Sequence, residues 1–370
     1  MADVKSKKKI VLVCNTSGNV VGFRRNLILR LKEEYDVSAI AFDRDCEKEA
    51  KELGVDFYCV GGSNRSLNPL KVFSLKKRYY EIIKKINPDV VFTFMLKPNI
   101  YATIAAKKAG VKRIISMVEG AGDAFTYDTF KWRMIRKYVT KKYKKAFKTV
   151  QKVFFLNEDD RKQFIHEGIV SVDKTEIVHG IGVDMDKFRF SPIKNHARFL
   201  MVAKMNVAKG VYEYCRAAEK VKEKYPDAVF EFLGAEGNIT LADLKGYIDS
   251  GVLTYSGFVK DVRPYLENST VLVLPSYREG LPISVVEAES MGRPVITTRT
   301  NGCIDCVKDG YNGFLVNVKE VGSLAQKMTY FIENPEKAVE MGNNARTFAE
   351  ENFDQKVINE RLFEVIEGKE

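Results

Sequence analysis

The feature that most constrains the fold of this chain is an alternation of short apolar runs with longer amphipathic segments, which occurs twice along the sequence. In the first half, the apolar runs with the length of buried strands are KIVLVCN, DVSAIAF, VDFYCV, DVVFTFM, RIISMVEG and KVFFLN. Helical segments follow these runs, apart from a loop, TSGNVVGF, after the first one. Strands that alternate with helices form a parallel sheet covered on both faces. The first half is therefore predicted to be a doubly wound α/β domain.

The alternation stops near residue 181 and starts again near residue 198. The intervening segment contains the glycine, proline and asparagine residues typical of a linker. The later strand-like runs are RFLMVA, AVFEFLG, LTYSGF, TVLVLPS, PVITTR and GFLVN. A chain of 370 residues also exceeds one ordinary core. We predict a first domain over 1–180, a linker over 181–197, a second α/β domain over 198–350, and a C-terminal helix over 351–370 that packs back toward the first domain.

The composition favours a cytoplasmic globular protein without a metal site. No apolar run approaches the roughly 18 residues of a membrane-spanning helix, and the N-terminal MADVKSKKKI lacks the apolar stretch of a signal peptide. The six cysteines are scattered, with one CxxC at Cys303 and Cys306, and the three histidines are isolated. Such spacing indicates free thiols in a reducing compartment and no metal ligands.

The formal net charge of +11 points to anionic partners, and the excess is concentrated in one segment. Residues Lys131–Lys152 contain ten Lys or Arg and no acid, and this segment is expected to be a helix. Five apolar residues lie near one side of it: Trp132, Ile135, Val139, Phe147 and Val150. These features fit either a solvated helix with a core-facing stripe or an interfacial helix on an anionic membrane. No nucleic-acid-binding motif accompanies the charge, so we expect no nucleic-acid partner.

The segment PSYREGLPISVVEAESMGRPVIT indicates a ligand site in the second domain. A strand ends at its start, a turn follows, and a helix begins near Ile283. The free N–H groups of a helix start bind anions, and Gly280 allows the backbone to approach a ligand closely. Glu279 and Glu287 lie either side of this helix start, where carboxylates can accept hydrogen bonds from hydroxyl pairs. Phosphate and hydroxyl groups together describe a nucleotide sugar.

Cations for that phosphate are supplied by VAKMNVAKG, which follows the first strand of the second domain. Lys204 and Lys209 both lie in this first strand–helix loop. No Walker motif and no GxGxxG follows any predicted strand, which disfavours a kinase or a dehydrogenase.

The segment from Pro275 to Val316 resembles the donor site of the retaining GT-B glycosyltransferases of family 4. The spacing of Glu279 and Glu287 matches their E-x7-E motif, and GIGVDMDKF matches their inter-domain segment. Lys209 matches one basic position, whereas Lys204 occupies a position where arginine is commoner. The resemblance implies two Rossmann-like domains that face each other across a cleft, with retention of anomeric configuration and without a metal or other cofactor.

The first half is similar to bacterial transferases that extend undecaprenyl-diphosphate-linked sugars. The enzyme type it most resembles adds N-acetylgalactosamine, from its UDP-linked form, to undecaprenyl-diphospho-N,N'-diacetylbacillosamine during protein N-glycosylation. The resemblance implies a peripheral location on the cytoplasmic face of the inner membrane. In the loop that follows the strand RIISMV, this sequence has VEGAG where relatives more commonly have Thr-Gly-Leu-Gly. Glu119 is thus a departure from the pattern of the relatives.

Residue roles follow from the matched positions. In the second domain, Glu279 should bind donor-sugar hydroxyls, Glu287 the ribose, and Lys204 and Lys209 the diphosphate. Backbone groups are expected to help at Gly280, Leu281 and Ile283 for the diphosphate, and at Gly257, Phe258 and Val259 for uracil. The acceptor-binding candidates in the first domain are Arg24, Arg25 and Lys97 for the lipid diphosphate, Gly18 and Gly22 for close approach to phosphates, and Glu119.

Other functions remain open at this stage. A family-4 transferase of capsule or O-antigen synthesis would use another UDP-sugar. A nucleotide-sugar epimerase shares the two-domain architecture but would need acid/base groups facing the sugar. A basic nucleic-acid-binding module would explain only the net charge and would leave the segment with Glu279 and Glu287 unexplained.

Overall fold

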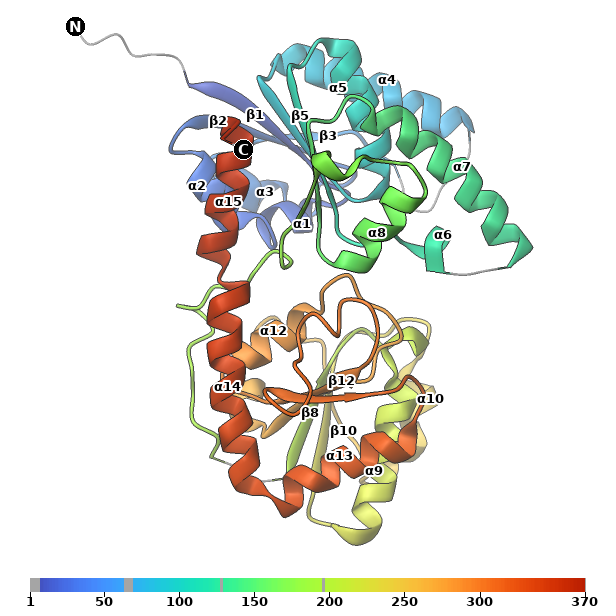
Figure 1. Ribbon diagram of the computed structural model, residues 1–370, viewed down its shortest axis with the longest axis vertical. Helices are drawn as coiled ribbons and strands as arrows, with labels where there is room; N and C mark the ends of the chain where they lie inside the picture. Colours follow the sequence, from blue (N-terminus) through green and yellow to red (C-terminus); the bar gives the residue numbers. More distant parts are fainter. Residues whose placement is uncertain (1–6, 63–68, 127–128, 195–196, 370) are drawn as a thin grey trace, which may run out of the picture. The chain divides into compact units, whose positions relative to one another are not determined.

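The computed structural model describes residues 7–62, 69–126, 129–194 and 197–369, which form two compact units (Figure 1). Unit 1 contains the residues up to Ile181 and those from Lys356 onward, and unit 2 spans Gly182–Gln355. Residues 195 and 196 of the predicted linker lie outside the described residues.

Unit 1 is built on a seven-stranded sheet with the order β3-β2-β1-β4-β5-β6-β7, in which every neighbouring pair is parallel. The strands are β1 (Lys8–Val13), β2 (Tyr35–Ala41), β3 (Asp56–Cys59), β4 (Val90–Phe94), β5 (Arg113–Val118), β6 (Lys152–Phe155) and β7 (Thr175–Ile177). All five residues of the central strand β4 are buried, as expected for a strand covered on both faces.

Helices cover both faces of this sheet, with α2, α3 and α15 on one side and α4, α5 and α7 on the other (Figure 1). The helical segments are α1 (Ser17–Val21), α2 (Arg25–Leu31), α3 (Glu47–Glu52), α4 (Pro69–Ile86), the π-helix η1 (Pro98–Ala102), α5 (Thr103–Ala109), α6 (Asp123–Thr126), α7 (Phe130–Phe147), α8 (Glu158–His166) and the 3-10 turn η2 (Val172–Lys174). The last helix, α15 (Gln355–Glu367), is tied to the rest of unit 1 by ion pairs of Arg361 with Glu176 (2.6 Å) and of Arg30 with Glu360 (2.7 Å).

Three details of unit 1 differ from the sequence-based prediction. The predicted loop TSGNVVGF contains a helical turn, α1, whose N-cap Thr16 accepts a hydrogen bond from the Asn19 N–H. The basic helix ends at Phe147, so that Val150 lies beyond it. The prediction also omitted α8 and β7, although Asn157 and three acids at the start of α8 are a recognisable helix start.

Unit 2 repeats the design with a six-stranded parallel sheet of order β10-β9-β8-β11-β12-β13. Its strands are β8 (Arg198–Val202), β9 (Val229–Leu233), β10 (Thr254–Gly257), β11 (Val271–Leu274), β12 (Val295–Thr298) and β13 (Gly313–Val316). Its helical segments are the 3-10 turn η3 (Val207–Lys209), α9 (Val211–Lys224), α10 (Leu241–Asp249), α11 (Arg263–Asn268), α12 (Ile283–Ser290), α13 (Val321–Glu333) and α14 (Pro335–Phe353).

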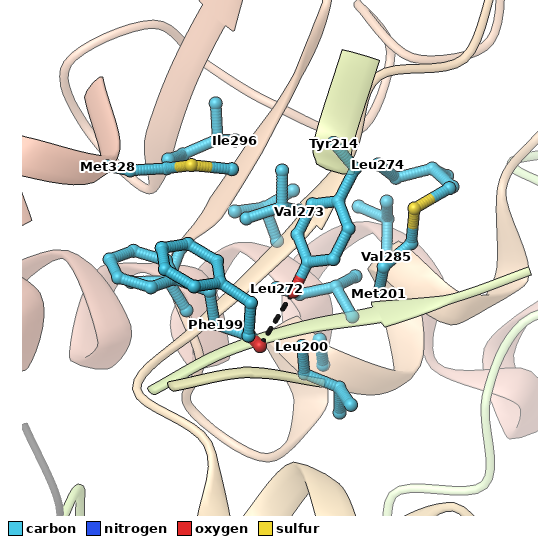
Figure 2. Close-up of a cluster of buried hydrophobic side chains, with 14 of the residues drawn as sticks. Phe199, Leu200, Met201, Tyr214, Leu272, Val273, Leu274, Val285, Ile296 and Met328 are labelled. Atoms are coloured by element: carbon cyan, nitrogen blue, oxygen red, sulfur yellow. Dashed lines mark hydrogen bonds between the residues drawn. The ribbon is translucent and has the colours of Figure 1, made fainter. Parts of the chain in front are cut away.

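The core of unit 2 packs α9, α12 and α13 against the central strands (Figure 2). Tyr214 of α9 is fully buried, and its hydroxyl donates to the Phe199 carbonyl of β8 at 2.8 Å. This bond satisfies the one polar atom that the aromatic side chain takes into the core.

Both sheets have the strand order of a doubly wound fold, and the predicted fold class is confirmed. The order reverses between β1 and β4 in unit 1 and between β8 and β11 in unit 2. Ligands of such sheets bind beyond the carboxyl ends of the strands at these reversal points. Among the described helices, none is both long and apolar enough to cross a membrane.

Candidate functional site

The reversal point of unit 2 carries three of the predicted site residues. Lys204 and Lys209 follow β8, and Glu279 follows β11. The two loops are locked together, because the Tyr277 N–H donates to the Ala208 carbonyl at 2.8 Å. Gly210 has a left-handed backbone (φ 74°), and a Cβ there would collide with the Pro275 carbonyl, so this close approach requires glycine.

Lys209 and Glu279 form a bidentate ion pair across these loops. The Lys209 Nζ lies 2.5 and 2.7 Å from the two carboxylate oxygens of Glu279. Ser276 Oγ donates to the same carboxylate at 2.7 Å, and the side chain of Glu279 is only 11% exposed, against 30% for Lys209. Lys204 is exposed and forms no ion pair with any described residue. The structure thus brings together one cation and one carboxylate that the sequence separates widely.

The start of α12 offers unpaired backbone donors beside this pair. Pro282 is the N-cap and provides no side-chain cap. Within the described parts of the chain, the N–H groups of Leu281, Ile283 and Ser284 have no hydrogen-bond acceptor, whereas those of the next residues return to the Pro282 carbonyl. Such donors, with the positive end of the helix dipole, favour an anion.

Glu287 lies one turn into α12 and is half-buried, with no side-chain hydrogen bond to a described residue. The pKa of its carboxyl is raised to about 7, chiefly by burial; nearby Lys187 lowers this pKa and Asp261 raises it, both by less than burial does. Asp261 lies in the loop after β10, close behind Gly257, Phe258 and Val259. Gly257 has a left-handed backbone (φ 74°), and Phe258 is exposed. The predicted ribose and uracil contacts therefore lie at the same edge of the sheet.

In unit 1, the structure pairs two of the predicted acceptor residues. The buried side chain of Arg24, in the loop after β1, forms an ion pair with the partly exposed Glu119, in the loop after β5. Burial lowers the pKa of the Arg24 guanidinium to about 10.

The other acceptor candidates of unit 1 take no part in that ion pair. Gly18 is in α1, and the N–H of Gly22, the C-cap, donates to the Gly18 carbonyl at 2.9 Å. Arg25 is exposed at the start of α2. Lys97 is buried before η1, and that burial lowers the pKa of its ammonium group.

Sequence reasoning missed the backbone strain beside Lys97. Met95 has φ 67°, which is uncommon for a residue with a side chain, and the following helix opens as a π-helix. The buried Asn99 holds this turn by donating to the Met117 carbonyl and accepting from Thr93 (2.8 Å each). Strain and π-helical turns both concentrate at functional sites. The Lys-Pro-Asn sequence indicates a turn but not its geometry.

Two family models match the chain. The model described as "Glycosyl transferases group 1" matches residues 184–348, and the one described as "Glycosyl transferase 4-like" matches residues 9–157. Together they cover the greater part of both units.

The chain is a glycosyltransferase, and its second unit matches the group 1 family.

Two curated relatives match most of their own length and most of this glycosyltransferase. The N,N'-diacetylbacillosaminyl-diphospho-undecaprenol alpha-1,3-N-acetylgalactosaminyltransferase of Campylobacter jejuni is 26% identical over 96% of this chain and 98% of its own. The UDP-Gal:alpha-D-GlcNAc-diphosphoundecaprenol alpha-1,3-galactosyltransferase of Escherichia coli is 28% identical over 79% of this chain and 78% of its own.

Solved structures agree on the fold. Anabaena HepE, crystallised with UDP-glucose, superposes with a TM-score of 0.80 over 97% of this chain and 99% of its own, at 16% identity. A glycosyltransferase from Rickettsia africae superposes with a TM-score of 0.80 over 98% of this chain and 99% of its own, at 20% identity. The predicted GT-B fold and glycosyltransferase activity are confirmed, and neither the epimerase nor the nucleic-acid alternative gains support.

The basic helix α7 of this glycosyltransferase has two apolar stripes rather than one. In the predicted stripe, Val139 and Phe147 are buried in the core, and Trp132 and Ile135 are partly buried against it. A second stripe, spaced every fourth residue, faces outward: Phe130 (79% exposed), Met134 and Tyr138. The predicted stripe is therefore the core-facing side of the helix.

Proposed function

We propose that this glycosyltransferase moves N-acetylgalactosamine from UDP-N-acetylgalactosamine, with retention of configuration, to undecaprenyl-diphospho-N,N'-diacetylbacillosamine. The similarity to the Campylobacter enzyme over nearly both full chains supports this donor and acceptor. The Escherichia coli relative is named for a different UDP-sugar but also for an undecaprenyl-diphosphate acceptor and an alpha-1,3 linkage. The acceptor class therefore has support from two relatives and the donor sugar from one, so a capsule or O-antigen transferase with another UDP-sugar is the second candidate.

The observation that carries the donor assignment is the Lys209–Glu279 pair beside the free amides of α12. In our proposal, the diphosphate takes Lys209, Lys204 and the amides near Gly280, Leu281 and Ile283, which stabilise the charge that develops on the leaving group. Glu279 then accepts hydrogen bonds from sugar hydroxyls, and Glu287 from the ribose. The leaving diphosphate helps to remove the proton of the attacking acceptor hydroxyl on the same face.

A substrate panel tests this function. The purified enzyme is incubated with UDP-linked N-acetylgalactosamine, galactose, N-acetylglucosamine and glucose, each with polyprenyl-diphosphate carrying N,N'-diacetylbacillosamine or N-acetylglucosamine. We expect the fastest transfer for the first donor with the first acceptor. Transfer of galactose to the N-acetylglucosamine acceptor would favour the second candidate, and isomerisation of a UDP-sugar alone would indicate an epimerase.

The raised pKa of Glu287 predicts that donor binding weakens as the pH falls. Ribose hydroxyls favour the ionised carboxylate, which is the major form only above the free-enzyme pKa of about 7. Between pH 8 and pH 6 the affinity for UDP-N-acetylgalactosamine should fall about tenfold, and binding at pH 7 should release about half a proton. Titration calorimetry in two buffers measures both. The UDP-sugar is the better probe, because the terminal phosphate of UDP itself titrates near pH 6, as phosphomonoesters do.

Glu287→Gln is the matched variant, because it keeps the shape of the side chain and removes the titration. It should bind the donor weakly and with the same affinity at pH 6 and pH 8. An unchanged pH dependence in this variant would contradict the ribose assignment.

We further propose that α7 docks the enzyme on an anionic membrane, at the cytoplasmic face of the inner membrane where its acceptor would lie. Five cations, Arg133, Arg136, Lys137, Lys141 and Lys144, line a hollow of about 550 Å³ on this helix, with Glu167 the one acid among its lining residues. Phe130, Met134 and Tyr138 lie exposed on the same helix, and Phe73 on α4 is exposed as well. Cations flanking an apolar stripe are typical of interfacial helices.

Replacing Phe130, Met134 and Tyr138 together with serine should weaken binding to vesicles containing anionic phospholipid by about tenfold or more, since each inserted side chain contributes on the order of 1 kcal/mol or more. This loss should persist in high salt, whereas neutralising lysines between Lys141 and Lys148 should matter only at low salt. Co-sedimentation with the vesicles measures binding. Val172→Ser, at an exposed apolar residue elsewhere in unit 1, is the control. Equal binding by the triple variant and the control would contradict the docking surface.

A further inference from the structure

The Arg24–Glu119 pair is placed where the central strands of unit 1 end. The guanidinium of Arg24 lies over the ring of Phe94, the last residue of β4, with 4.2 Å to the centroid. One of its nitrogens also approaches the Met117 sulfur of β5 at 4.0 Å. The guanidinium of Arg24 is therefore held against the neighbouring strands β4 and β5. Since Arg24 follows β1, it lies at the reversal point between β1 and β4, where ligands of such sheets bind.

The two side chains of this ion pair differ in their exposure to solvent. The side chain of Arg24 is 4% exposed, and its Nε is buried without a hydrogen-bond partner. Glu119 is 16% exposed, so its carboxylate meets solvent more than the guanidinium does. Among the described residues, Arg24 is the ion-pair partner of Glu119. A ligand at this site meets the carboxylate, not the guanidinium.

The loop that carries Glu119 is also held in place. The Ala121 N–H donates to the Asp160 carboxylate at 2.9 Å, and the Asp160 N–H donates to Asn157 Oδ1 at 2.8 Å at the start of α8. These bonds are buried, so that Glu119 is presented by a fixed backbone.

We propose that Glu119 recognises hydrogen-bond donors of the acceptor sugar, hydroxyl or acetamido N–H groups, and that Arg24 is a positioning residue that orients its carboxylate. A carboxylate accepts hydrogen bonds from such groups and repels phosphate, and its pairing with Arg24 leaves the site without net charge. The acceptor diphosphate is then bound elsewhere, with Arg25 as the exposed cation on the next residue. This inference rests on the proposed function, and it differs from the sequence-based prediction that Arg24 contacts the diphosphate.

Steady-state kinetics of Glu119→Gln tests the proposal, with UDP-N-acetylgalactosamine and the polyprenyl-diphosphate sugar that performs best in the substrate panel. The KM for the acceptor should rise tenfold or more, while the KM for the donor and the slow hydrolysis of donor without acceptor stay as in the wild type. A rise in donor KM, or an unchanged acceptor KM, would overturn the assignment. Absence of transfer by the wild type with every acceptor would instead count against the proposed function itself.

Two further variants separate recognition from folding. Arg24→Met combined with Glu119→Leu replaces this largely buried pair with apolar side chains, a change that often preserves stability. It should melt near the wild-type temperature and still have the poor acceptor KM, and a wild-type acceptor KM would overturn the proposal. Arg24→Met alone should raise the KM for diphosphate- and monophosphate-linked acceptors by the same factor. A larger rise for the diphosphate would restore the phosphate role of Arg24.

Discussion

Replacing Lys209 with alanine should lower kcat for sugar transfer at least about a hundredfold, because it removes a fixed cation from the charge that develops on the leaving diphosphate. Glu279→Gln should cause a loss of similar size, since the neutral amide accepts hydrogen bonds from sugar hydroxyls less strongly than a carboxylate does. Initial rates at saturating donor and acceptor, with circular dichroism to check the fold, measure both effects. Lys220→Ala, at an exposed lysine of α9, is the control and should retain full activity.

The double variant distinguishes two roles for this ion pair. If Lys209 and Glu279 act as one unit on the donor, their losses should be far from additive, because each change already disables the unit. If the pair only braces the loops after β8 and β11, replacing both with apolar side chains should restore activity together with stability. Recovery of transfer by Lys209→Met combined with Glu279→Leu would therefore contradict the donor role.

The sequence carried enough information to predict the two sheets but not the pairing within the sites. Apolar runs such as those around Val91 and Val273 are buried on both faces, so their composition indicates a parallel sheet directly. Lys209 and Glu279 are 70 residues apart, and their contact depends on the neighbouring positions of β8 and β11, which no local pattern encodes. The same holds for Arg24 and Glu119, which were predicted as separate acceptor contacts.

The helix α7 shows a second kind of limit. Its sequence holds two apolar stripes, one through Val139 and Phe147 and another through Phe130, Met134 and Tyr138. Periodicity identifies both as faces of a helix but does not tell which one meets the core. Only the packing of α7 against the rest of unit 1 shows that the stripe through Val139 and Phe147 faces the interior and that the other stripe faces outward.

Arg293 was not predicted as important at all, because a single charged residue between Gly292 and Pro294 is usually at the surface. In the structure it is fully buried, and burial lowers the pKa of its guanidinium to about 10. It donates to four carbonyl groups and one hydroxyl: those of Leu266 (2.7 Å), Ser191 (2.9 Å), Gly292 (3.3 Å), Glu267 (3.3 Å) and Ser191 Oγ (2.6 Å). Arg293 thus joins the end of α11, the segment before β8 and the residues after α12.

Arg293→Met should therefore lower the free energy of unfolding of unit 2 by about 3–5 kcal/mol, because methionine fills part of the space but leaves several buried carbonyl groups without donors. The exposed Arg299, paired with Asp309, provides the control, and Arg299→Met should cost at most about 1 kcal/mol. Trp132 lies in unit 1, so its fluorescence during urea unfolding follows that unit, and hydrogen exchange of the β12 amides follows unit 2. A loss of protection in β12 with an unchanged Trp132 transition would place the effect in unit 2. Equal stability of the two variants would show instead that the buried hydrogen bonds of Arg293 contribute no more than a surface ion pair.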